Sequence, residues 1–192
     1  TLRQAGLKYY GHLELRTGNH LVRVLVRNAE TGRTGIASLE VQVPAATSDP
    51  VLLPPFFLEG PGRWLLVRER SALGQADVVY PFTVKGEPYV PAARPVLFGA
   101  RSAKLCLVAY NLGPGEPGLT ATVLLPNGEQ VDGGRLALVE RTATGIEGLD
   151  KYLAEFGAAG LKPGRYTLRI SANGATAAGR PVSSIPFDVV LN

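Results

Sequence analysis

The chain has 192 residues, 45% of them hydrophobic and 19% charged, a composition that favours one large or two small globular domains and excludes a disordered chain. The net charge is +4, and the basic residues are spaced singly along the sequence instead of forming clusters interleaved with aromatic residues, so we do not expect nucleic-acid binding. One Cys excludes an internal disulfide, no apolar run of about 18 residues could span a bilayer, and the absence of Met suggests an excised piece of a longer polypeptide.

Residues 1–44 predict an incomplete β-sandwich module. Residues 7–15 alternate well enough for one strand, and residues 19–28 and 36–43 predict a hairpin that turns at Glu30-Thr31-Gly32. The alternation places on the inward face Val22, Val24, Val26, Leu39, Val41 and Val43. Three strands are too few to cover their own apolar face. We therefore expect missing chain or another subunit to complete this module by strand addition.

Residues 45–62 predict a packed, extended linker. The stretch from Pro44 to Pro61 contains five prolines, both ends included, and the apolar run at 51–58 lies among them, unlike a flexible Gly/Ser linker. A proline-rich recognition motif at Pro54-Pro55 is the alternative, but the neighbouring phenylalanines favour burial.

Residues 63–192 predict a second β-sandwich domain with a short helix near 145–157. Its expected strands cover 64–70, 78–84, 104–112, 119–125, 135–141, 165–172 and 185–191. Asn127-Gly128 is the strongest hairpin signal of the chain. The helix is predicted from a capping box at Thr144 and Glu147 and from the helical spacing of Ile146, Leu149, Leu153 and Phe156.

An internal repeat supports this all-β, tandem immunoglobulin-like arrangement. Shifting the sequence by 146 positions places residues 18–24 on residues 164–170 without a gap, and Leu39, Val41 and Val43 on Ile185, Phe187 and Val189. Each copy predicts the hairpin that closes a β-module.

Residues that could carry chemistry are scarce, and we predict no catalytic residue, no cofactor and no metal site, and hence no enzyme. Cys106 lies inside an apolar strand, which favours a buried and unreactive thiol. His12, Glu14 and His20 lack a fourth ligand and any diagnostic metal spacing.

A possible interaction surface lies on the outward side of the first hairpin. Leu21 and Leu25 alternate there with Arg23 and Arg27, and apolar residues on a solvent face suggest cover by a partner or another strand layer. Glu40 could pair with these arginines across the hairpin. Tyr9 and Tyr10 could extend this surface, although core and edge packing is the alternative for them.

The run 17–32, closing at Val41-Gln42-Val43-Pro44, resembles the terminal hairpin of immunoglobulin-like modules in bacterial envelope proteins. The segments 80–82, 89–92 and 108–112 are similar to the C-terminal region of VWFA-related proteins common in Acidobacteria. The VWFA part itself is absent, because no Asp-x-Ser-x-Ser motif occurs. The resemblance implies a secreted, periplasmic or cell-surface location and a role in adhesion or assembly.

The sequence therefore predicts a noncatalytic segment that acts in protein–protein contact, with a protein partner or a neighbouring domain, or as a structural spacer. Two alternatives remain open at this point. One is a structural subunit of a larger multi-chain assembly, such as a surface filament or a membrane complex. The other is a carbohydrate-binding accessory module of a secreted hydrolase.

Overall fold

The computed structural model describes residues 7–10, 13–45, 48–60, 65–68, 82–84, 87–99, 101–173 and 181–190. The described residues are all-β, which confirms the predicted fold class. They contain no helix, in contrast to the short helix predicted near 145–157. The strands are β1 (Leu7–Tyr10), β2 (Gly18–Arg27), β3 (Thr34–Val43), β4 (Val51–Leu52), β5 (Phe56–Glu59), β6 (Leu65–Arg68), β7 (Phe82–Val84), β8 (Glu87–Pro91), β9 (Val96–Phe98), β10 (Ser102–Tyr110), β11 (Thr120–Leu124), β12 (Gln130–Val131), β13 (Arg135–Ala143), β14 (Leu149–Gly157), β15 (Gly164–Ser171) and β16 (Val182–Val190).

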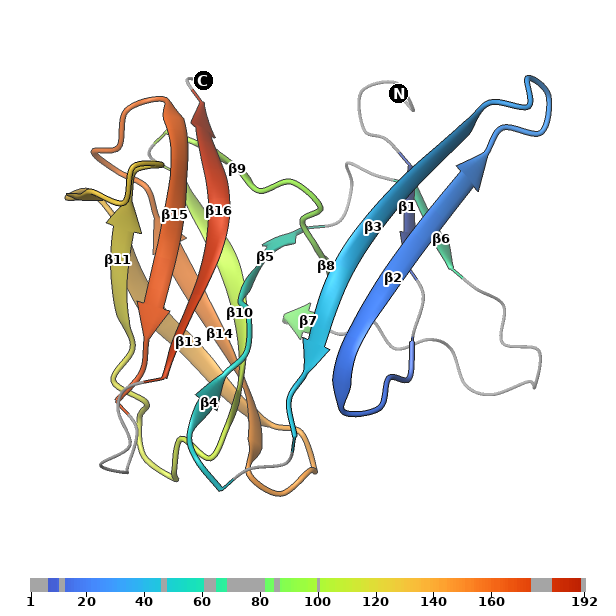
Figure 1. The fold of residues 1–192 in the computed structure, drawn as a ribbon. Helices are drawn as coiled ribbons and strands as arrows, with labels where there is room; N and C mark the ends of the chain where they lie inside the picture. Colours follow the sequence, from blue (N-terminus) through green and yellow to red (C-terminus); the bar gives the residue numbers. More distant parts are fainter. Residues whose placement is uncertain are drawn as a thin grey trace.

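Two sheets form a β-sandwich (Figure 1). One sheet has the strand order β13-β14-β10-β5-β8-β7, with β4 also paired to β10, and the other has the order β12-β11-β15-β16-β9. All pairings in the sandwich are antiparallel except that of β16 with β9, which is parallel.

The core lies between these two sheets. Phe156 of the first sheet and Phe187 of the second meet edge to face, with ring centroids 5.5 Å apart. The rings of Phe57 and Tyr166 also contact that of Phe187, with centroid distances of 5.9 and 5.6 Å. Because aromatic side chains bury large apolar areas in such clusters, this group of rings joins the sheets. Leu105, at 0% exposure, belongs to the same core.

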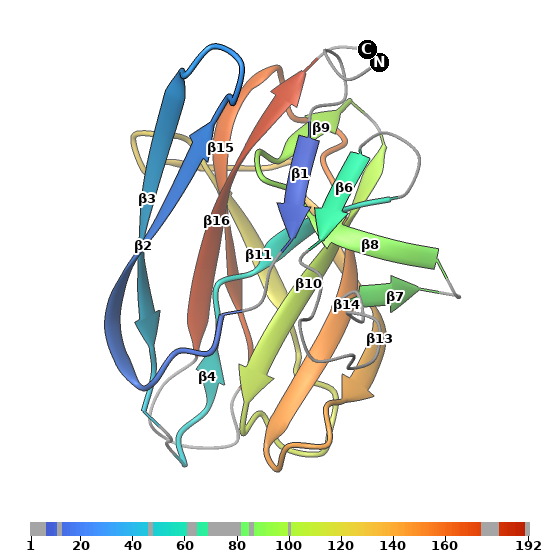
Figure 2. The same cartoon turned by 90° about the vertical axis from the view of Figure 1, so that its right-hand side faces the viewer.

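The hairpin β2–β3 stands beside the sandwich as a separate two-stranded sheet (Figures 1 and 2). The predicted strand at 7–15 does not join this hairpin. Its described strand is the shorter β1, which pairs in parallel with β6. Within the described part of the chain, the hairpin is therefore left without a third strand.

The predicted helix near 145–157 is wrong. Residues 149–157 form β14, which pairs with β10 on one side and β13 on the other. Thr144, expected to cap a helix, instead accepts a hydrogen bond from the amide of Ile146 (3.2 Å) and donates one to the carbonyl of Leu149 (2.8 Å). The predicted capping box thus forms a tight turn that leads into the strand.

The segment 45–62 contributes strands to the sandwich. Within it, β4 and β5 pair with β10, and Leu52 and Phe57 are buried.

Asn127-Gly128 turns the chain between β11 and β12, with Gly128 at φ 86° and the amide of Leu125 donating a hydrogen bond to the carbonyl of Glu129. Such a left-handed conformation favours glycine, as the sequence predicts here.

Candidate interaction surface

The turn of the hairpin β2–β3 is held by its own hydrogen bonds. The side-chain oxygen of Asn28 accepts hydrogen bonds from the amides of Glu30 (2.9 Å) and Thr31 (2.8 Å). The amide of Gly32 donates to the carbonyl of Asn28 (2.9 Å), and Gly32 has a φ of 68°. An Asn followed by a left-handed Gly is a common way to close such a loop, so the sequence itself shapes this turn.

The two faces of the hairpin differ in chemistry. One face, here called the valine face, carries no carboxylate, ammonium or guanidinium group; it consists of His20, Val22, Val24, Val26, Ala37, Leu39, Val41 and Val43. The other face, here called the arginine face, mixes apolar and polar side chains; it consists of Asn19, Leu21, Arg23, Leu25, Arg27, Thr34, Ile36, Ser38, Glu40 and Gln42.

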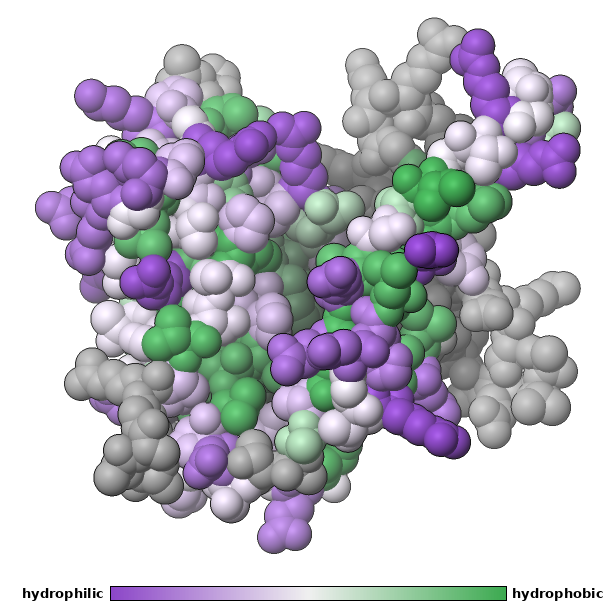
Figure 3. Space-filling view, in the orientation of Figure 1, coloured by the Kyte–Doolittle hydropathy of each residue, from purple (hydrophilic) through white to green (hydrophobic). Residues whose placement is uncertain are grey.

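Both faces are open to solvent over much of their length. On the valine face, Val22 is half-buried, but Val24 and Leu39 are 53% and 65% exposed. On the arginine face, Leu25 and Ile36 are 62% and 68% exposed. Figure 3 shows hydrophobic side chains on the surface of the hairpin, interspersed with hydrophilic ones. The sequence predicts that the valine face is buried, but toward the turn of the hairpin its side chains are exposed in this chain.

The structure places four of the six predicted surface residues together. Leu21, Arg23, Leu25 and Arg27 line the β2 side of the arginine face, and all four are exposed. No salt bridge joins these arginines to Glu40 within the described residues, so the expected cross-strand pair is not formed.

The two predicted tyrosines lie on another strand. Tyr9 is 64% exposed on β1, which pairs with β6 and not with the hairpin. Tyr10 belongs to the same strand, and its side chain lies outside what the structure describes.

The outer edges of the hairpin have no strand partner among the described strands. An unpaired edge presents a row of backbone N–H and C=O groups that can pair with another strand. A two-stranded sheet with exposed apolar side chains is also marginally stable by itself. The hairpin thus combines strand edges that are unpaired among the described strands with exposed apolar side chains.

The reactive side chains of the described residues are either buried or dispersed. Cys106 is 1% exposed, and burial raises its pKa to about 12, although Lys151 partly opposes this shift. His20 donates its Nε2 proton to the carbonyl of Arg16 at 2.6 Å. No cluster of three or more His, Cys, Asp or Glu side chains that could hold a metal occurs in the described part of the chain. His12 lies outside the described residues.

A cleft of about 500 Å³ on the sandwich was not anticipated from the sequence. It opens between β5 and β9, with Arg94 and Arg101 among its lining residues. Arg94 forms an ion pair with Asp188 (3.0 Å), and Arg165 contacts the same carboxylate (3.4 Å). These contacts keep the pKa of Asp188 below its usual value, chiefly through the hydrogen bond from Arg94. Arg94 and Arg165, which meet at Asp188, come from distant parts of the sequence, so no local pattern marks this pair.

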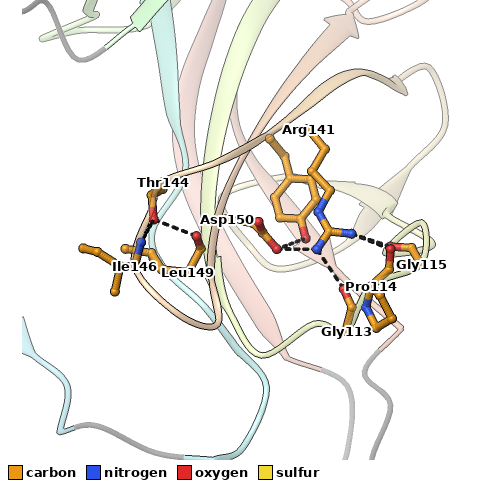
Figure 4. A network of polar contacts seen from close by, with 9 residues as sticks. Gly113, Pro114, Gly115, Arg141, Thr144, Ile146, Leu149 and Asp150 are labelled. Carbon is orange, nitrogen blue, oxygen red and sulfur yellow. Dashed lines mark hydrogen bonds and ion pairs between the residues drawn. The ribbon is translucent and has the colours of Figure 1, made fainter.

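A second polar group organises one end of the sandwich (Figure 4). The guanidinium of Arg141 donates to the carbonyls of Gly113 (3.0 Å), Pro114 (2.7 Å) and Gly115 (3.2 Å) and forms an ion pair with Asp150 (2.5 Å). Arg141, on β13, thus joins the Gly- and Pro-rich loop at residues 113–115 to Asp150 of β14. Because the guanidinium is engaged in these four contacts, we assign Arg141 a structural role.

No protein-family model and no curated protein sequence match this chain. Among solved structures, a family 123 glycoside hydrolase from Clostridium perfringens, described in a structural analysis of glycolipid glycan hydrolysis, is similar to it with a TM-score of 0.38 and 12% identity. The similar region covers 52% of this chain and 22% of that chain. A similarity of this size does not extend to function. No described helix is long and apolar enough to cross a membrane.

Proposed function

We propose that the chain is a noncatalytic structural segment of a bacterial secreted or envelope protein, and that it acts through protein–protein contact made by the hairpin β2–β3. The location follows from the resemblance to VWFA-related envelope proteins. The contact is proposed from the hairpin, because a partner domain would remove its apolar side chains from water.

The observation that carries this proposal is exposure on both faces of one strand. Val26 on the valine face and Leu25 on the arginine face are 66% and 62% exposed. Isolated apolar residues on a surface need no explanation, but a ten-residue strand with apolar residues open on both faces does. The two sheets of the sandwich, by contrast, bury the apolar side chains of the core between them, and no buried polar side chain of the described residues is unsatisfied.

Amide hydrogen exchange tests the proposal. The hairpin amides are expected to exchange rapidly in the isolated 192-residue chain and at least about 10-fold more slowly in the natural polypeptide that carries it, because contact suppresses local opening. The amides of β15–β16 serve as the matched control and should be protected equally in both samples. Equal exchange of the hairpin amides in the two samples would argue against a contact made there.

A further inference from the structure

We infer that β2–β3 is the closing hairpin of a second β-sandwich, and that its valine face is covered by sandwich strands that precede it in the natural polypeptide. This inference rests on the proposed function and names the partner: a β-sheet with an apolar face, supplied in cis. It also assigns the two faces of the hairpin different roles, since only one is covered.

The first argument is the register of the two repeated hairpins. In β2–β3, Gly18 pairs with Val43, and in β15–β16, Gly164 pairs with Val189. Gly164 lies 146 positions after Gly18, and Val189 lies 146 positions after Val43, which is the spacing of the sequence repeat. The same shift relates every pair from there to Leu25↔Ile36, which corresponds to Ser171↔Val182. Over these pairs the two copies thus share their cross-strand register and the side of the hairpin on which each side chain lies, because a one-residue slip would exchange the faces.

The second argument is the environment of the second copy. The residues equivalent to the valine face are almost all buried against the opposite sheet; they include Tyr166, Leu168, Ile170, Ala172, Phe187 and Val189. The residues equivalent to the arginine face remain on the outside, and Arg169, equivalent to Arg23, is exposed. Val182, equivalent to Ile36, is 54% exposed although the sandwich around it is complete. Exposure of the arginine face is therefore compatible with a finished module.

The third argument is chemical complementarity. The valine face presents six Val and Leu side chains and no carboxylate, ammonium or guanidinium, so an apolar sheet can cover it without burying any of these three groups. Covering the arginine face would instead desolvate Arg23 and Arg27, for which Glu40 provides no salt bridge. The two faces therefore differ in the same way as the inner and outer faces of a sandwich sheet.

Chain order identifies the source of the covering sheet. In the second copy, the strands that cover and flank β15–β16 include β10, β11 and β14, all of which precede it in the sequence. There β11 pairs with the outer edge of β15 in antiparallel fashion, and β9 pairs with the edge of β16 in parallel. By the same shift, residues 21–25 of β2 should receive an antiparallel strand and residues 42–44 a parallel one.

Cysteine labelling on opposite faces of one strand tests this inference. Val24→Cys and Leu25→Cys are neighbours on β2 and are exposed to similar extents in this chain, at 53% and 62%. The native thiol of Cys106 is 1% exposed and should contribute no fast reaction. Each variant is labelled with a small maleimide in the 192-residue chain and in the natural polypeptide including the residues before Thr1. Leu39→Cys replaces Val24→Cys as the valine-face probe if circular dichroism shows that the latter is misfolded.

We expect the thiol at position 24 to react at least about 100-fold more slowly in the natural polypeptide, and the thiol at position 25 to change by less than about 3-fold. Protection of position 25 alone, or of both positions equally, would overturn the inference while leaving a hairpin contact, and so the proposed function, in place. No protection at either position would overturn both. Concentration-dependent protection in the 192-residue chain alone would identify a second copy as the occupant instead. A natural polypeptide without a sandwich-sized stretch before Thr1 would also refute the cis origin.

Discussion

The same substitution made in each repeated hairpin should have very different consequences for stability. Leu168 is fully buried, whereas Leu39 is 65% exposed, and the two belong to equivalent cross-strand pairs, Leu168↔Ile185 and Val22↔Leu39. Truncating a buried Leu to Ala costs about 2–5 kcal/mol because it removes apolar burial and leaves a cavity. Truncating Leu39 removes little burial and should cost about 0.5 kcal/mol or less.

Urea unfolding of the isolated chain, followed by far-ultraviolet circular dichroism, measures both effects. With an m-value of about 2 kcal/mol/M, a loss of about 3 kcal/mol in Leu168→Ala lowers the midpoint by about 1.5 M. Leu39→Ala should shift it by less than about 0.3 M. Leu25→Ala, on the other face of the hairpin, is the control and should behave like Leu39→Ala. If Leu39→Ala destabilised the chain as much as Leu168→Ala, the hairpin would be packed within this chain, and the reasoning from its exposure would fail.

Three further predictions concern the sandwich. Arg141→Lys should lower the free energy of unfolding by about 1–2 kcal/mol in urea titrations, because an ammonium cannot reproduce the forked contacts to three carbonyls and Asp150. The same substitution should speed exchange of the Gly113 and Gly115 amides, and unchanged exchange there would contradict the role of this arginine. Cys106, with its pKa raised to about 12, should stay unreactive toward a disulfide reagent at pH 8 until urea unfolds the chain, and rapid native labelling would contradict its burial. Gly148→Ala should cost more than Gly145→Ala, since both glycines have positive φ but only at Gly148 would the new methyl group meet the Asn111 side chain; equal thermal midpoints would show that backbone strain alone matters.

The sequence alone determined the strands whose signals are local. The alternation of Val22, Val24 and Val26 predicted β2, and the turn chemistry at residues 30–32 and at Asn127-Gly128 predicted where the chain reverses. These signals succeed because side-chain alternation and positive φ depend only on neighbours in the chain. The repeat also predicted two equivalent hairpins, and their register matches pair for pair.

Tertiary structure decided what residues 149–157 become. Leu149, Leu153 and Phe156 fit a helical spacing, but Tyr152, Ala154 and Phe156 also alternate along a strand. The segment lies between β10 and β13, where each strand neighbour supplies backbone hydrogen bonds and the opposite sheet supplies a core. A helix could not satisfy both neighbours, so the nonlocal pairing prevailed over the local pattern.

Tertiary structure alone also decided which hairpin is buried. The two copies share their pattern and register, yet Ile170 is fully buried and its equivalent Val24 is 53% exposed. Alternation specifies which side of a strand should face a core, but it cannot specify whether a second sheet is present to form that core. The physical reason is that burial belongs to the contact between two surfaces, and a local sequence describes only one of them.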